Sequence, residues 1–330
     1  MTGGAMDIPA AAPRRRGRLF ENGFPYWHEL VLVVLLAGLM LFAWWKDPTF
    51  VQPATQISRS SELWERAILA LPMTLIIITA GIDLSIGSAM ALCAVAMAIL
   101  HGAGLPMPLA MGAALLIGLA CGLLNGAFIA FVGVHPLLVT LATYSAFRGF
   151  AEGISHGESI KGFPQWFPSV AGSVGGVPVA GIVFALGAVV TAVVLARTPL
   201  GRWVYAMGYN ETACRFSGVP TRRVKLMLYA LAGLAAGVAA VIYTARVNTA
   251  GADQGTGYEL DVITAVVLGG TSIFGGRGRI LGTVLGLLLI HETREFVGWR
   301  WPQELISIVV GALLICSVLL NMLLTPRGRE

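Results

Sequence analysis

Charge is scarce in this sequence. Only 12% of its 330 residues are Asp, Glu, Lys or Arg, whereas 56% are hydrophobic. A soluble domain of this length could not bury so much apolar surface, so the composition predicts a protein that crosses a membrane several times. The net charge of +5 does not indicate a nucleic-acid partner, because the basic residues cluster beside apolar runs and lack interleaved aromatic residues.

Motifs for catalysis and cofactor binding are also missing. The glycine-rich stretch 268–282, LGGTSIFGGRGRILG, lacks the GK[S/T] ending of a phosphate-binding loop, and the sequence has no GxGxxG. HETRE, which begins at His291, has a glutamate where a zinc protease has its second histidine. The four cysteines stand apart, without metal-ligand spacing. We therefore expect no cofactor, no metal site and no enzymatic activity in this chain.

Apolar stretches near the length needed to cross a bilayer follow one another along the chain. Their ranges are 28–45, 63–82, 84–101, 108–132, 136–152, 178–197, 224–244, 260–275, 280–297 and 303–323. The predicted fold is all-α, a polytopic membrane helical bundle with about ten transmembrane helices. Only GIDLS separates the second range from the third, and 260–275 is short enough to be a broken helix. Five spans on each side of the middle are compatible with an inverted repeat, although the two halves show no convincing similarity of sequence.

Basic residues flank the ends of these spans. The four basic groups are Arg14, Arg15, Arg16 and Arg18 before the first span, six residues within 197–225, Arg277 with Arg279, and Arg327 with Arg329. With ten spans, all four groups fall on one side, which the excess of positive charge identifies as cytoplasmic. Both termini are therefore predicted to be cytoplasmic. Residues 1–26 and 324–330 form two tails around a transmembrane domain at 27–323.

The most polar interval of the chain is 197–225. It carries six Lys or Arg residues against one acid, Glu211. The turn signals TPLGR and SGVPTRR bracket a segment of helical character, roughly 203–216. A helix lying along the cytoplasmic face of the membrane would be a docking surface for another protein. The alternative is a basic loop that only sets the topology.

Asp83 lies in TAGIDLSIGSAM, with apolar residues on both sides. A carboxylate at membrane depth is costly and by default indicates a polar site. Gly81 and Gly87 flank it, and would allow a broken helix of the kind that lies against transport paths. Alternatively, Asp83 caps the helix that follows it. The two roles are compatible.

Other polar groups lie inside the expected spans. Thr140, Tyr144 and Arg148 recur at every fourth position and so share one helix face, which would either line a hydrated path or bond to neighbouring helices. The residues predicted to belong to the path or to broken helices are Asp83, Ser85, Asn125, Thr140, Tyr144, Arg148, Gly269 and Gly270. Glu259 and Asp261 stand at the outer entrance of the eighth span, where they would receive a docking partner or cap the helix.

Several stretches, taken jointly and in order, resemble the permease subunits of bacterial ABC sugar importers of the ribose/galactose/xylose type. These stretches are GIDLSIGS (81–88), LLNGAFIAF (123–131), HPLLVTLATYSAFRG (135–149), GRWVYAMGYNETACRFSGV (201–219) and YELDVITAVVLGGTSIFGGRGRILGT (258–283). The likeness covers most of the chain from about residue 65 onward. The combination is specific, although no single motif would be.

The resemblance implies a location in the bacterial inner membrane and a set of partners. These are a second permease subunit, two cytoplasmic ATP-binding subunits that hold the ATP and Mg, and a periplasmic sugar-binding protein. It also implies a cytoplasmic coupling helix, matched by 203–218, that sits in a cleft of the ATPase. The residues assigned to this coupling are Trp203, Met207, Gly208, Asn210, Glu211, Ala213, Arg215 and Gly218. Cys214 and Tyr209 depart from the small residues that are common there.

The chain is thus interpreted as the path subunit for a monosaccharide or a related polar solute, with ATP hydrolysed by a separate partner. The alternative is a stand-alone secondary transporter or channel for a small polar solute, in which Asp83 would bind a coupling ion. That alternative explains broken helices but not the long patterned loop at 197–225. Pentoses, hexoses, deoxyhexoses, nucleosides and a furanosyl signalling molecule all remain open as solutes, as does the choice between a homomeric and a heteromeric permease pair.

Overall fold

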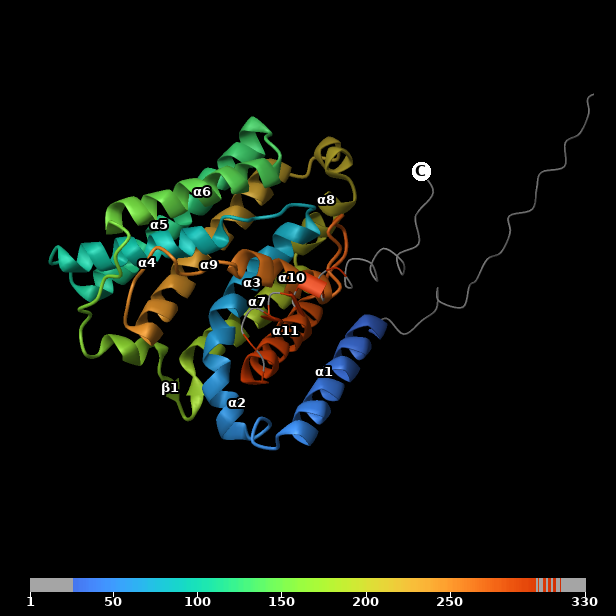
Figure 1. Cartoon of the computed structure of the whole chain (residues 1–330). Coiled ribbons are helices and arrows are strands. Elements are labelled where there is room, and N and C mark those ends of the chain that lie inside the picture. Colours follow the sequence, from blue (N-terminus) through green and yellow to red (C-terminus); the bar gives the residue numbers. More distant parts are fainter. Residues whose placement is uncertain are drawn as a thin grey trace, which may run out of the picture.

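The computed structural model describes residues 26–300 and, beyond them, residues 302, 305, 306, 308, 309, 311, 312 and 315. The described chain is largely helical (Figure 1). Its longer helices are α1 (Trp27–Lys46), α3 (Leu63–Ile78), α4 (Ile86–Gly102), α5 (Met107–Ala127), α6 (Pro136–Ser155), α7 (Val179–Arg197), α8 (Pro199–Phe216), α9 (Thr221–Val247), α10 (Tyr258–Leu268) and α11 (Ile280–Arg300). The shorter elements are α2 (Pro53–Arg59), η1 (Ser60–Glu62), the π-helical turn η2 (Phe128–Val132), η3 (Phe167–Ala171) and the paired strands β1 (Ser173–Val174) and β2 (Val177–Pro178).

The predicted all-α class is confirmed, and each expected range from 28–45 to 280–297 overlaps one of these helices. Four helical stretches are long and apolar enough to cross a membrane by length and composition: Trp27–Lys46, Met107–Val132, Val179–Arg197 and Thr221–Val247. The second and eighth ranges were drawn too long, since α3 stops at Ile78 and α10 at Leu268. Two further predictions lie outside the described residues. They are most of the range 303–323 and the two predicted tails, of which only Tyr26 is described.

Glycines on α5 and α9 allow these two helices to pack closely in the core. A Cβ atom on Gly118 would lie 2.3 Å from the carbonyl oxygen of Gly233, and one on Gly122 would lie 2.2 Å from the carbonyl oxygen of Tyr229. Only glycine permits backbones to approach so closely, as is common where helices pack in membranes. The signal in the sequence is the spacing of Gly118, Gly122 and Gly126, every fourth residue on one face of α5.

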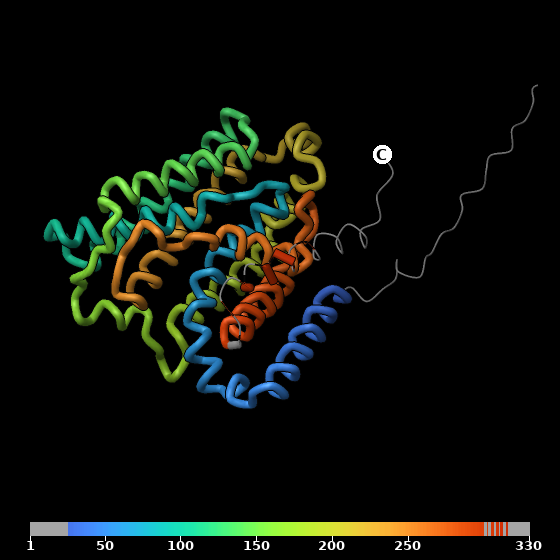
Figure 2. Tube along the Cα trace, in the orientation of Figure 1, coloured from blue at the N-terminus to red at the C-terminus, as the bar shows by residue number. Residues whose placement is uncertain are grey.

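Two helices begin at the same point inside the molecule. After α3 the chain runs without helix through residues 79–85 to the start of α4, and after α9 it does so through 248–257 to the start of α10 (Figure 2). A Cβ atom on Gly87, in the first turn of α4, would lie 2.3 Å from the carbonyl oxygen of Gly255, just before α10. These helices correspond to the second and third and to the seventh and eighth expected spans. This matching plan is what an inverted repeat of five spans would produce.

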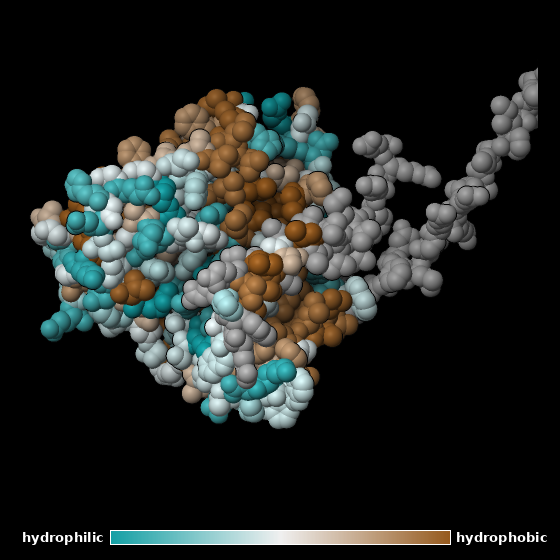
Figure 3. Space-filling model, in the orientation of Figure 1, coloured by the Kyte–Doolittle hydropathy of each residue, from teal (hydrophilic) through white to brown (hydrophobic). Residues whose placement is uncertain are grey.

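Apolar side chains are widely exposed on the outer helices. Leu41 on α1, Leu116 on α5 and Leu186 on α7 are each more than 60% exposed. Figure 3 shows hydrophobic residues in a broad band across the middle of the molecule and hydrophilic residues gathered at the left end of the view. So much exposed apolar surface is unfavourable in water and suits contact with lipid.

Candidate functional site: the cleft beside α8

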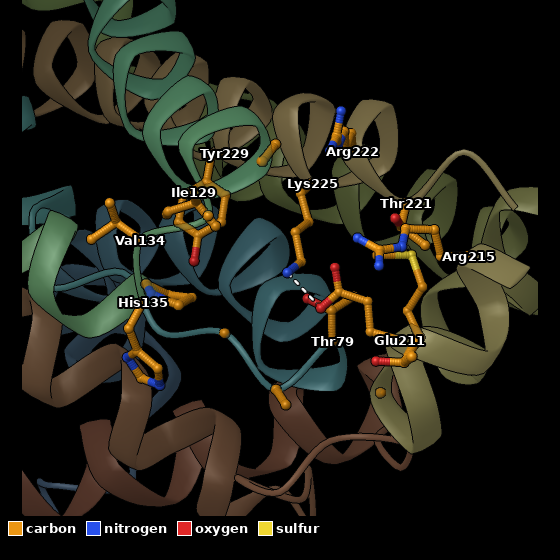
Figure 4. Close-up of a pocket in the computed structure, with 18 of the residues that line it drawn as sticks. Thr79, Ile129, Val134, His135, Glu211, Arg215, Thr221, Arg222, Lys225 and Tyr229 are labelled. Carbon is orange, nitrogen blue, oxygen red and sulfur yellow. Dashed lines mark hydrogen bonds and ion pairs between the residues drawn. The ribbon is translucent and has the colours of Figure 1, made fainter.

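A cleft of about 670 Å³ opens beside α8 and is called here the α8 cleft. Its walls are residues 79–81 after α3, residues 129–136 between α5 and α6, residues 207–212 with Arg215 of α8, and the first turns of α9. Figure 4 shows Lys225 of α9 reaching to Glu211 of α8, with His135 on the other side of the opening. Four separate parts of the chain therefore meet around one hollow.

The helix α8 begins and bends for local reasons. The Thr198 hydroxyl accepts a hydrogen bond from the Gly201 amide at 3.3 Å, and Pro199 occupies the first turn, where its missing N–H costs nothing. At Asn210 the backbone leaves the helical region (φ −160°, ψ 96°), and the Asn210 side-chain oxygen accepts from the Ala213 amide at 2.8 Å. Asn210 thus caps a second, short helical part. The expected single segment near 203–216 is longer than predicted and consists of two parts.

Gly208 brings three backbones into contact. A Cβ atom there would lie 1.9 Å from the carbonyl oxygen of Ile78 and 2.2 Å from the amide nitrogen of Gly276. The Gly276 amide itself donates to the Ile78 carbonyl at 2.8 Å. This Gly208 junction joins α8, the last residue of α3, and the glycine loop, which we define as residues 269–279 between α10 and α11.

Side chains around the junction add further links. The Tyr205 hydroxyl donates to the carbonyl oxygen of Gly278 at 2.8 Å, and burial raises the pKa of this phenol, an effect that the positive charge of Arg279 partly opposes. Met207 is buried and Trp203 half-buried, so this face of α8 packs against the rest of the chain. The first part of α8 is therefore fixed to the glycine loop.

The second part of α8 is more open. Ala213, Arg215 and Gly218 are exposed, and Glu211 forms an ion pair with Lys225 at 2.6 Å. Figure 4 shows Arg215 and Lys225 on either side of Glu211. The residues assigned to coupling therefore divide into a packed set, Trp203 to Gly208, and an accessible set after the break at Asn210. Their role in coupling stays a prediction.

Asp83, Ser85 and Asn125 form one buried cluster, although Asn125 lies forty positions further along the chain than Ser85. One carboxylate oxygen of Asp83 accepts from the Ser85 amide at 2.9 Å and from the Ser85 hydroxyl at 2.7 Å. The Asn125 amide group donates to the Ser85 hydroxyl at 2.8 Å. Asp83 thereby fixes the turn just before α4. The N-cap of α4 is Ser85, and no side chain caps the helix there, so Asp83 does not act as the cap that the alternative expected. A part in transport stays a prediction.

The predicted polar face of α6 is used partly for packing. Thr140 is buried and donates to the carbonyl oxygen of Pro136 at 3.0 Å. Arg148 donates to the carbonyl oxygens of Ala252 and, at 2.9 Å, of Gln254, so it ties α6 to the segment before α10. Tyr144 is half-buried, and the centroid of its ring lies 6.0 Å from Cζ of Arg148. Neither Thr140 nor Arg148 faces the α8 cleft.

Glu259 and Asp261 are buried within the fold. Asp261 is 8% exposed and forms ion pairs with Arg66 of α3 at 3.2 Å and Arg294 of α11 at 2.6 Å. Glu259 is 7% exposed, and one of its oxygens accepts from the Gly257 amide at 3.2 Å. Only Glu259 bonds to the backbone at the start of α10, so the capping alternative does not describe Asp261, which joins helices instead. The docking role of both residues stays a prediction.

Gly269 and Gly270 serve close packing at the end of α10. A Cβ atom on Gly269 would lie 2.5 Å from the backbone of Gly282 in α11. Gly270 has a φ of +87° and lies against the His28 ring, whose Nε2 is 2.9 Å from the carbonyl oxygen of Leu268. The two glycines begin the glycine loop but do not line the α8 cleft.

The sequence analysis missed two features of this site. Gly275 and Gly276 have φ values of +85° and +75°, and their contact with Gly208 pairs two glycine motifs that lie far apart in the chain. Lys225 was recognised only as one basic residue among six, whereas it partners Glu211 in the α8 cleft. The glycine pair itself was visible in the sequence, but its partner was not.

Comparison with known proteins agrees with the resemblance noted in the sequence. A family model described as branched-chain amino acid transport system / permease component matches residues 66–318. The autoinducer 2 import system permease protein LsrD of Yersinia pseudotuberculosis serotype O:1b is 36% identical over 303 residues, covering 89% of this chain and 90% of that protein. LsrD of Yersinia enterocolitica serotype O:8 is 39% identical over 261 residues, covering 76% and 78%. No solved structure matches significantly.

Proposed function

Because this chain belongs to the family of transport-system permease components, we propose that it is driven through α8 by a separate ATP-binding subunit. It is a permease subunit of the ABC sugar-importer type, as the resemblance predicted. The proposal concerns its coupling, its partners and its solute. The single observation that carries it is the Gly208 junction, through which α8 touches the last residue of α3 directly.

A displacement of α8 would reach the buried cluster by a short route. At the Gly208 junction the Ile78 carbonyl accepts a hydrogen bond from the Gly276 amide. Asp83 lies five residues after Ile78 in the chain. Close-packed interiors pass on displacements instead of absorbing them. We infer that closure of the ATPase moves α8, and that α8 moves the interruption between α3 and α4.

The full assembly follows the same proposal. Ten spans cross the bacterial inner membrane, both termini are cytoplasmic, and 197–225 faces the cytoplasm because its six basic residues favour that side. The partners are a second permease subunit, two ATP-binding subunits that bind ATP and Mg, and a periplasmic sugar-binding protein. Since relatives are named for the import of autoinducer 2, we propose a solute of that kind, small and polar.

Arg215 offers the test of the coupling. It is exposed on the second part of α8, where its guanidinium could meet a carboxylate of the ATPase. Arg215→Ala should reduce ATP hydrolysis stimulated by the loaded binding protein about tenfold, the effect of roughly 1.4 kcal/mol. Arg197→Ala, which removes another exposed guanidinium, at the end of α7, is the matched control. Unchanged assembly and unchanged stimulation in Arg215→Ala would refute this role.

A further inference from the structure

The glycine loop carries a prominent exposed side chain, Phe274. The loop is closed by its own backbone hydrogen bonds, from the Ser272 amide to the Arg277 carbonyl at 3.0 Å and from the Gly275 amide to the Ser272 carbonyl at 2.9 Å. Phe274 stands at this turn and is 77% exposed. A fixed loop that holds a phenyl ring in water bears an energetic cost, since burying such a ring is worth about 1.5–3 kcal/mol.

Three of the four most exposed aromatic side chains in the described part of the chain lie in α8 or in the glycine loop beside it. Phe216, at the end of α8, is 83% exposed, and Phe216 and Phe274 are the two most exposed large hydrophobic side chains in the described part of the chain. Tyr209, also in α8, is 67% exposed. Exposed aromatic residues of this kind supply much of the binding energy of protein interfaces.

The glycine loop and α8 are held together as one body. A Cβ atom on Gly276 would lie 3.0 Å from the Tyr209 ring, and the Tyr205 hydroxyl donates to the Gly278 carbonyl at 2.8 Å. Figure 1 shows the orange loop before α11 lying alongside α8. The loop therefore continues the surface that α8 presents.

Basic charge predominates on this surface, since the acid of α8, Glu211, is paired with Lys225. Arg215 of α8 and Arg277 of the glycine loop are both exposed. Together with the aromatic rings, they fit a protein surface that offers an apolar pocket with acidic residues around it.

We propose that the glycine loop is a second docking element for the ATP-binding subunit, with Phe274 as its apolar anchor. The inference rests on the proposed function, because it takes α8 as the first docking element. It adds a contact outside 197–225, in a loop that follows α9 and α10 in the sequence. The ATPase would then bind two connected elements, α8 and the glycine loop, and its movement would act on both.

Site-specific photo-crosslinking in membranes containing the whole importer tests this inference. A benzophenone amino acid replaces Phe274 in one variant, Phe216 in a second and Trp166 in a third. Trp166 is 46% exposed and lies just before η3, outside α8 and the glycine loop, so it is the control. We expect crosslinks to the ATP-binding subunit from positions 274 and 216 and none from 166.

The outcomes separate the two proposals. A crosslink to the ATPase from 216 alone, with position 274 joined only to lipid, to another copy of this chain or to nothing, overturns the docking role of the glycine loop and leaves that of α8 intact. No crosslink to the ATPase from either position overturns both. As a second measurement, Phe274→Ala should weaken retention of the ATPase about tenfold, whereas Phe150→Ala, at a 65% exposed site on α6, should not change it.

Discussion

The two ends of α3 lie in contrasting surroundings. Near its start, Glu65 pairs with Arg246 at 2.9 Å, and Arg66 pairs with Asp261, so the charges are partnered within the chain. At its end, Ile78 meets Gly208 and Gly276, beside a cleft rimmed by exposed basic residues. The charges at the first end hold helices together, whereas at the second end Arg215 and Arg222 are exposed and accessible to a partner.

We expect the two ends of α3 to have different roles. The ion-paired end connects α3, α9, α10 and α11 and is expected to govern stability. The α8 end is built from glycine contacts and an accessible helix, and is expected to govern coupling. Variants at each end should therefore change different measured quantities.

Asp261→Asn should produce the largest loss of stability. The substitution leaves Arg66 and Arg294 without the carboxylate that both contact, and breaking a buried ion pair typically costs about 3–5 kcal/mol. Thermal unfolding in detergent should show a clearly lower midpoint. Asp253→Asn, at an exposed carboxylate, is the control, and equal midpoints for the two variants would contradict the structural role of Asp261.

Asp83→Asn should impair uptake even where the complex assembles. The change removes the charge that strengthens the two hydrogen bonds from Ser85, each worth roughly 1.5–3 kcal/mol when the acceptor is ionised. The start of α4 would then lose its fixed geometry. Uptake and complex recovery are measured in parallel, and normal uptake would count against a role for Asp83 in the interruption.

Gly208→Ala should uncouple ATP hydrolysis from uptake. The added methyl group would overlap the backbone of Ile78 and Gly276, and overpacking of this kind costs about 1–3 kcal/mol. We expect uptake per ATP hydrolysed to fall several-fold. Gly149→Ala, on α6 where nothing lies within 4 Å of the added atom, is the matched control. If uptake per ATP hydrolysed were the same in both variants, the Gly208 junction would not transmit the movement of α8.

Glu211→Gln should have the smallest effect. The Glu211 side chain is 43% exposed, and ion pairs in such positions contribute only about 0.2–1 kcal/mol. The melting temperature should hardly change, whereas stimulated ATP hydrolysis should become more sensitive to added salt, because Lys225 loses its partner and adds to the positive charge of the docking surface. A loss of stability as large as that of Asp261→Asn would remove the contrast between the two ends of α3.

Local signals allowed most of the helices to be predicted. Gly269 and Gly270 mark the true end of α10 at Leu268, and reading them as a stop would have corrected the range 260–275. Asn210, followed by Glu211, is a typical helix start that would have predicted the two parts of α8. These features depend on neighbours in the sequence and were accessible to pattern analysis.

The contacts of the candidate site could not be predicted in this way. Asn125 reaches Ser85, and Gly208 meets Gly276, only because the fold brings distant segments together. The sequence identified Asp83, Ser85 and Asn125 as polar residues among apolar ones, but not their hydrogen bonds. A single sequence does not show which residues of one helix contact those of another, so these contacts can be seen only in the structure.

The most direct test of the account is to purify the tagged chain from membranes in mild detergent and identify its partners by mass spectrometry. The same experiment is repeated with residues 203–218 replaced by a Gly/Ser linker and with Arg215→Ala, which leaves the backbone of α8 intact. We expect an ATP-binding subunit to accompany the unmodified chain, to be lost with the linker and to be reduced with Arg215→Ala. Recovery of the chain alone, still able to move solute across vesicles without ATP, would contradict coupling through α8.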